Sequence, residues 1–316
     1  MTRLVAGRVA ALTLASATAS AQPTPVFRAG LDLVNVTVTV RDGKGGLVSD
    51  LTADDFVVRE DGRPQKVEIF APAARPEERE ELALNLGMLF DTSESMRKDL
   101  KLSQQSAIRF LDAIPRARDL VLIFFDRDIR LSRYSSENQQ GIFGRILEAE
   151  SQGFTALYDA ITVYLSRIAD TPGRKILVVF TDGDDTTSQV PPQEVQRLVR
   201  SSDAIIYPVA FPGEFRPGSS EGLRARSFLH SIAELSGGRV FQPTASRELA
   251  GIYQSILDEL GMQYVLGYVS DNAKRDGRFR RITVGLKRPA LRARHRPGYD
   301  APKDAPPPKP KAPGKK

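Results

Sequence analysis

Four short apolar runs, separated by stretches of helical character, constrain the fold of this 316-residue chain more than any other feature. Runs of this length without polar alternation are typical of parallel strands that are buried on both faces. Their alternation with helical segments predicts a doubly wound α/β domain with a mostly parallel sheet, which we place at residues 82–260. We expect its strands at Leu86–Phe90, Val121–Phe125, Ile176–Phe180 and Ala204–Val209.

A small β module is expected to flank this domain. Valine occupies every even position from 34 to 40 with polar residues between, and such alternation marks a half-buried strand. We place the N-terminal module at residues 27–70, followed by a Pro- and charge-rich linker over 71–81. Two further strands are expected within residues 261–299. Pairing of these strands with the N-terminal module is a hypothesis that the sequence leaves open.

The two ends of the chain have the composition of segments outside a folded core. Arg3 and Arg8, a mildly apolar stretch and Ala19-Ser20-Ala21 resemble a cleavable signal peptide, which we assign to residues 1–21. The apolar stretch is shorter than the roughly 20 residues of a membrane-spanning helix. Residues 300–316 are rich in Pro and Lys and are expected to be disordered. We therefore expect a periplasmic or secreted protein without a membrane span.

Composition limits the kinds of chemistry that the chain can carry out. Cysteine is absent, which excludes disulfides, thiolate nucleophiles and thiolate zinc sites. The two histidines, His230 and His295, lack the spacing of a zinc hydrolase. Residues 272–298 carry ten Lys or Arg against one Asp. Within them, the alternating run 292–296 is typical of a solvated edge strand, with an anion site as the alternative.

Oxygen-bearing side chains follow the strands of the expected sheet. Asp91, Ser93 and Ser95 come directly after the first strand, and Asp182 follows the strand Ile176–Phe180. Thr155 opens the helix that precedes that strand. Ligands of open parallel sheets bind at the carboxyl ends of the strands, so these side chains are expected to meet. The simpler interpretation is that Asp91 and the serines only cap a helix.

The pattern D-x-S-x-S, then a lone Thr, then an Asp resembles the metal-ion-dependent adhesion site of von Willebrand factor type A domains. The resemblance covers about residues 82–260. It implies that Asp91, Ser93, Ser95, Thr155 and Asp182 hold a divalent metal. Many members of the family have Gly where this chain has Glu94, whose carboxylate either points to solvent or crowds the site.

The flanking segments resemble the bacterial VWFA-related proteins of acidobacterial type. The resemblance rests on Asp55-Phe56, on the segment Glu60–Gln65 and on Arg296-Pro297-Gly298-Tyr299. These flanking motifs are less distinctive than the metal motif.

The implied site suits Mg²⁺ or Mn²⁺ better than Ca²⁺, because hydroxyls supply most of its ligands and few carboxylates coordinate directly. The charge of the metal ion is then incompletely neutralised by its ligands, and an Asp or Glu carboxylate of a partner protein would complete its coordination shell. The prediction is thus a metal-dependent protein-binding module with no catalytic residues. Two alternatives remain: an envelope scaffold whose basic C-terminus binds an anionic polymer, not nucleic acid, or a Mg²⁺-dependent phosphoester hydrolase.

Overall fold

The computed structural model describes residues 33–73, 84–113, 117, 119–135, 141–169, 171–213, 218–243 and 245–303. All of them belong to one compact unit of the chain. The predicted signal peptide, most of the predicted linker and residues 304–316 of the predicted tail lie outside the described residues.

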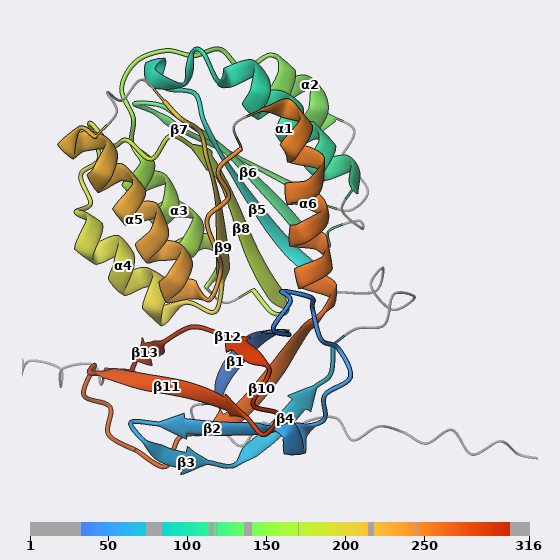
Figure 1. The fold of residues 1–316 in the computed structure, drawn as a ribbon. Coiled ribbons are helices and arrows are strands. Elements are labelled where there is room, and N and C mark those ends of the chain that lie inside the picture. The colour runs from blue at the N-terminus through green and yellow to red at the C-terminus, as the bar shows by residue number, and fades with distance from the viewer. Residues whose placement is uncertain are drawn as a thin grey trace, which may run out of the picture. The chain divides into compact units, whose positions relative to one another are not determined.

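The α/β domain is built on a five-stranded sheet with the strand order β7-β6-β5-β8-β9 (Figure 1). Its four parallel strands and the antiparallel edge strand β7 give a mostly parallel sheet. The doubly wound α/β prediction is therefore confirmed. The strands are β5 (Leu84–Asp91), β6 (Asp119–Phe125), β7 (Ile129–Ser135), β8 (Arg174–Thr181) and β9 (Ile205–Ala210).

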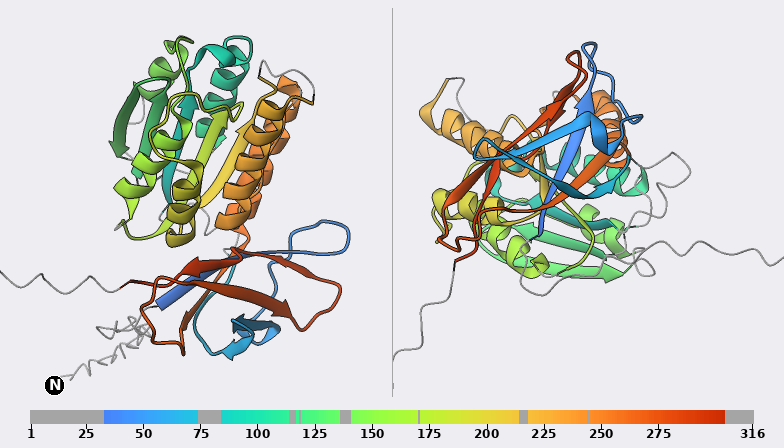
Figure 2. Two further views of the ribbon diagram at one scale, coloured as in Figure 1. Left: turned by 90° about the vertical axis from the view of Figure 1, so that its left-hand side faces the viewer. Right: turned by 90° about the horizontal axis from the view of Figure 1, so that it is seen from below.

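Helices cover both faces of this sheet (Figures 1 and 2). One face packs against α1 (Leu100–Ala113), α2 (Gly141–Leu147) and α6 (Ser246–Gly261). The other face packs against α3 (Leu157–Ile168), α4 (Pro192–Ser201) and α5 (Ser220–Ser236). Each face has its own apolar core, which explains why β5 and β9 are buried at every position.

Two features of the sheet differ from the sequence expectation. Strand β7 was not predicted, because its alternation of Arg and Ser with apolar residues is typical of an edge strand that is only half covered. Strand β9 begins at Ile205 and ends at Ala210, one residue later at each end than expected, and it contains Pro208. Proline is tolerated here because β9 is the opposite edge strand.

The flanking β module contains strands from both ends of the described chain. One sheet has the order β12-β1-β10-β4 and the other β13-β11-β2-β3. Hydrogen bonds of β1 with β10, and of β11 with β2, join the two ends of the chain, the arrangement that the sequence left as a hypothesis. The strands are β1 (Leu33–Arg41), β2 (Phe56–Glu60), β3 (Arg63–Gln65), β4 (Val67–Ala71), β10 (Gln263–Val269), β11 (Phe279–Leu286), β12 (Arg292–Arg294) and β13 (Gly298–Asp300). Short 3-10 helices are η1 (Ala53–Asp55) and η3 (Glu94–Met96).

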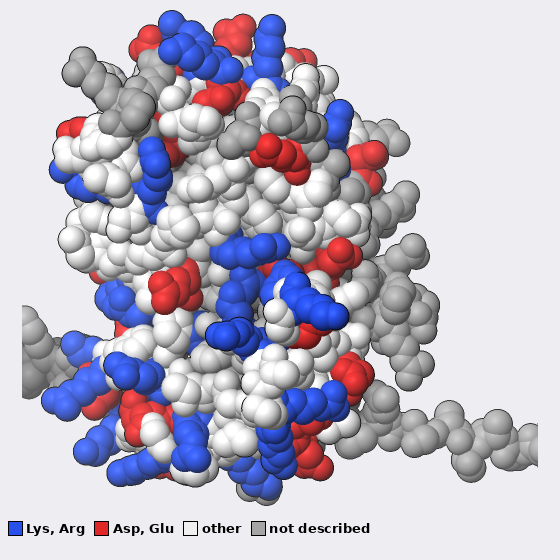
Figure 3. Space-filling model, in the orientation of Figure 1, with Lys and Arg blue, Asp and Glu red and all other residues white. Residues whose placement is uncertain are grey.

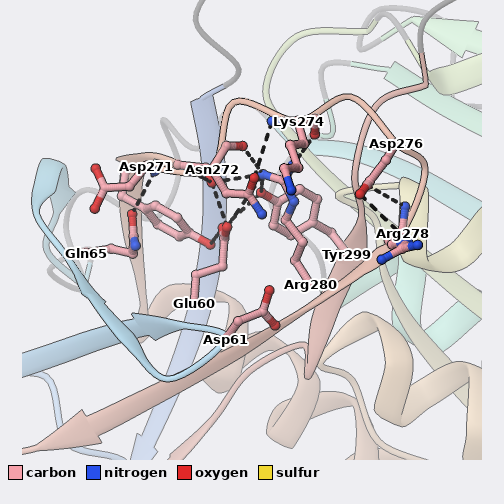
Figure 4. Close-up of polar contacts among 12 residues, drawn as sticks. Glu60, Asp61, Gln65, Asp271, Asn272, Lys274, Asp276, Arg278, Arg280 and Tyr299 are labelled. Carbon is pink, nitrogen blue, oxygen red and sulfur yellow. Dashed lines mark hydrogen bonds and ion pairs between the residues drawn. The ribbon is translucent and has the colours of Figure 1, made fainter.

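A buried polar network connects the two chain ends within this module (Figure 4). Glu60 and Arg280 are almost fully buried and form an ion pair of 3.5 Å. The Tyr299 hydroxyl donates to Glu60 Oε2 at 2.9 Å. At Gly298 a Cβ would come 2.1 Å from the Arg280 carbonyl oxygen, so only glycine allows β13 to pair here. The Arg296–Tyr299 motif thus has a structural role.

The C-terminal basic run is only partly as expected. Strand β12 lies at the edge of its sheet, but Arg294 pairs with the buried Glu259, and Arg296 donates to the carbonyl oxygens of Asn35 and Ser202. The ordered chain also extends into the predicted tail, because Ala301 is buried and its N–H bonds to the Arg278 carbonyl oxygen. Every helix in the described part of the chain is too short or too polar to cross a bilayer.

Candidate metal centre

The first loop of the candidate site follows β5 at the carboxyl edge of the sheet. Asp91 and Ser93 are fully buried, and Ser95 is half-buried within η3. Asp91 Oδ1 accepts the Ser93 N–H at 2.9 Å, which folds the chain back on itself. The Ser93 and Ser95 hydroxyl oxygens lie 3.1 Å apart. Three oxygen-bearing side chains are thereby held on one short turn.

The second loop, residues 151–155, is bonded directly to the first. The Gln152 N–H donates to the Thr92 carbonyl oxygen at 2.8 Å, and the Glu94 N–H donates to the Gly153 carbonyl oxygen at 3.1 Å. Gly153 has φ = 70°, a left-handed conformation that favours glycine. These bonds bring buried Thr155 to the same edge as Asp91.

The third loop follows β8 and is bonded to both others. The Thr181 hydroxyl donates to Asp91 Oδ2 at 2.6 Å. The Thr186 N–H donates to the Thr155 carbonyl oxygen at 2.9 Å. Asp182 Oδ1 accepts the Asp184 N–H at 3.0 Å, whereas its Oδ2 is buried without a hydrogen-bond partner among the described residues.

Burial makes the two aspartates costly to ionise. Desolvation, followed by the negative charge of Asp182, raises the pKa of Asp91 to about 7. Desolvation also raises the pKa of Asp182, while hydrogen bonds from the Asp184 N–H and the Ser95 hydroxyl act in the opposite direction. Two buried carboxylates thus lie close enough for the charge of one to act on the other.

The donor set fits a hard divalent cation. A buried oxygen without a partner is rare in folded proteins and points to a ligand, water or ion. Magnesium favours oxygen donors and keeps several waters, which matches two carboxylates and three hydroxyls. Within the described residues, no three His, Cys, Asp or Glu side chains are grouped to hold a metal. The site therefore depends on Ser93, Ser95 and Thr155.

The comparison with known protein families concerns the α/β domain that holds these three loops. Residues 87–184 match the family described as the von Willebrand factor type A domain. The chain carries a von Willebrand factor type A domain. Such a domain supports, in general, a role as a protein-interaction module.

Several proteins resemble this chain. A UPF0353 protein of Nocardia farcinica is 20% identical over 217 residues, covering 60% of this chain and 65% of that protein's length. A von Willebrand factor type A structure from Catenulispora acidiphila has 12% identity and a TM-score of 0.48, covering 89% of this chain and 76% of its own. An aerotolerance-related membrane protein from Bacteroides fragilis has 17% identity and a TM-score of 0.45, and the match covers 56% of this chain and 98% of that one.

Three residues that hold the loops of the candidate site in place were not identified from the sequence. Thr181 bonds Asp91, Asp126 accepts from the Thr92 hydroxyl at 3.2 Å, and Asp185 accepts the Tyr158 N–H at 2.9 Å. Asp126 directly follows β6, and an acidic residue at the end of a predicted strand was the available signal. Glu94 points to solvent, 61% exposed, and pairs with Arg97 at 2.6 Å.

Proposed function

We propose that this chain is an exported, metal-dependent protein-binding module. A Mg²⁺ ion, or Mn²⁺ in its place, is held by Asp91, Ser93, Ser95, Thr155 and Asp182. The ion recognises an Asp or Glu carboxylate on a partner protein. The observation that carries the proposal is the convergence of three hydrogen-bonded loops on two buried carboxylates, one with a partnerless oxygen.

The charge of these residues explains why an anionic partner is expected. Hydroxyl ligands carry no charge, and a carboxylate that acts through water neutralises a cation less than a direct ligand does. A partner carboxylate then completes the coordination shell through a charge-assisted interaction. Glu94 does not compete for this position, since its carboxylate is turned to solvent and paired with Arg97.

The surface next to the metal loops supplies an apolar contact. Phe154 directly precedes Thr155, and its side chain is 60% exposed. An exposed aromatic residue beside a charged site is typical of the anchor residues of protein interfaces. We propose that the partner places an apolar group against Phe154 when its carboxylate reaches the metal.

Titration with Mg²⁺ by calorimetry, after treatment with EDTA, tests the metal site first. We expect binding to the native protein and none to Asp91→Ala or Thr155→Ala, while far-UV circular dichroism shows that all three remain folded. Glu94→Gln is the matched control and should bind Mg²⁺ like the native protein. Equal Mg²⁺ binding by Asp91→Ala would contradict the assigned ligands.

Capture of partners from an envelope extract tests the second step. We expect a partner retained in Mg²⁺ and released by EDTA, and not retained by Asp91→Ala. Equal retention in EDTA would contradict the adhesion mechanism. The same preparations distinguish the hydrolase alternative, which requires turnover of a generic phosphoester that disappears with Asp91→Ala. We propose that no such turnover occurs.

A further inference from the structure

Three arginines converge on one buried carboxylate at the C-terminal end of α6. The Glu259 side chain is fully buried, and its Oε1 lies 2.6 Å from Arg41 Nη2 and 2.8 Å from Arg239 Nε. Its Oε2 accepts from Arg294. Arg41 comes from β1, Arg294 from β12, and Arg239 from the segment after α5. We call these four residues the arginine cluster.

The charges of the arginine cluster do not balance. Three guanidinium groups face a single carboxylate, which leaves a surplus of two positive charges. The positive charges of Arg294 and Arg41 lower the pKa of Arg239, after the larger effect of desolvation. Arg294 Nη1 is buried and has no acceptor among the described residues. A water molecule would satisfy that nitrogen but would not neutralise the charge.

The cluster is also open to solvent. The side chains of Arg41, Arg239 and Arg294 are 33%, 38% and 29% exposed, although Glu259 beneath them is not. Lys and Arg side chains gather on this face, at the height where α6 meets β1 and β12 (Figure 3). A ligand can therefore reach these side chains without unfolding the chain.

We propose that the arginine cluster binds a phosphate-type oxyanion. A divalent oxyanion matches the surplus of two charges, whereas chloride or a single carboxylate does not. Planar guanidinium groups bind the oxygens of phosphate and sulfate in pairs, which a spherical halide cannot reproduce. The site is separate from the metal centre, and its residues come from several folded elements of the chain.

Calorimetric titration with inorganic phosphate and with sulfate, in EDTA and at constant ionic strength set with chloride, tests the proposal. We expect saturable 1:1 binding of phosphate to the native protein. Arg239→Gln should weaken it by about tenfold or more, the effect of losing one charge-assisted contact. Arg239→Lys keeps the charge without the planar fork and should give an intermediate affinity.

Arg224→Gln is the matched control, because Arg224 is 74% exposed on α5 and outside the cluster. It should bind phosphate like the native protein, as should Asp91→Ala, whose defect concerns only the metal centre. A thermal melt in chloride shows whether each variant is folded. Absence of saturable binding, or equal phosphate affinity in Arg239→Gln and Arg224→Gln, would overturn the proposal. Parallel titrations with a phosphorylated polymer and with free phosphate distinguish the source of the oxyanion.

Discussion

Asp182 shows how one residue can favour binding at the expense of the metal-free fold. Its buried Oδ2 has no partner among the described residues. Desolvation and the nearby charge of Asp182 together raise the pKa of a second buried carboxylate, Asp91. Asp182→Asn keeps the side-chain oxygen that accepts the Asp184 N–H but removes the repulsion. We expect its melting temperature in EDTA to equal or exceed that of the native protein.

The same substitution should abolish stabilisation by metal. At a Mg²⁺ concentration of 100 times the dissociation constant, the native protein should gain about 2.7 kcal/mol. Asp182→Asn should gain little, because it lacks one of the two charges that attract the cation. Thermal melts with and without Mg²⁺ measure both effects. If Mg²⁺ does not change the melting temperature of the native protein, the assigned metal site is contradicted.

His295 makes the stability of the folded protein depend on pH. Its Nε2 accepts the Val284 N–H at 3.2 Å, so its proton sits on Nδ1, which contacts the Arg296 carbonyl oxygen at 2.7 Å. Desolvation and the charge of Arg296 lower its pKa below 6.5. The unfolded chain then binds the proton more readily than the folded one. The contribution of His295 to the free energy of unfolding is therefore fully present above pH 6.5 and is lost as pH falls through the lowered pKa.

Melting temperatures between pH 8 and pH 5 test this dependence. His295→Gln should reduce the loss of stability over this range. The exposed His230 is the matched control, and His230→Gln should keep the native pH dependence. A pH dependence that is the same in both variants would show that other groups control it.

At the scale of elements, the contact between β5 and α3 limits the side chains that the central strand can carry. A Cβ at Gly87 would come 2.1 Å from the ring of the fully buried Tyr164. That ring cannot retreat, because its hydroxyl donates to the Ile176 carbonyl oxygen at 3.0 Å. We expect Gly87→Ala to lower the free energy of unfolding by about 1–3 kcal/mol, the usual effect of overpacking.

Gly144 on α2 provides the opposite case. A Cβ there meets no atom within 4 Å, and Ala favours a helix over Gly by about 0.5–1 kcal/mol. Gly144→Ala should therefore stabilise the protein. Urea titrations of both variants and of the native protein measure the two effects, and Gly87→Ala should be the destabilised variant. Loss of stability in both variants would point to a general intolerance of alanine at these helix and strand glycines.

Sequence patterns identified the elements whose burial is uniform. Strands β5, β6 and β8 are covered on both faces, so their apolar runs are continuous and easily recognised. Strand β7 is half exposed, so it lacks a continuous apolar run and was not predicted. The candidate ligands were found because each follows a strand or opens a helix. Thr181 was missed because its role depends on a contact with Asp91 of the neighbouring strand, which spacing along the sequence does not encode.

At the scale of the whole molecule, the arginine cluster links the α/β domain to strands from both ends of the chain. Glu259 belongs to the last helix, Arg41 to β1 and Arg294 to β12. Removing one partner from a buried ion pair leaves the remaining charges uncompensated. Glu259→Gln should lower the free energy of unfolding by about 3 kcal/mol. The exposed Glu221→Gln should leave it nearly unchanged.

Phosphate should reverse part of this loss. Without the Glu259 charge, three guanidinium groups repel one another, and a bound oxyanion is the remaining source of negative charge at the cluster. Melts of Glu259→Gln in phosphate and in chloride, at equal ionic strength, should therefore differ more than those of the native protein. If the loss is the same in both anions, Glu259 alone holds the arginines, and the cluster joins the chain ends without binding an external anion.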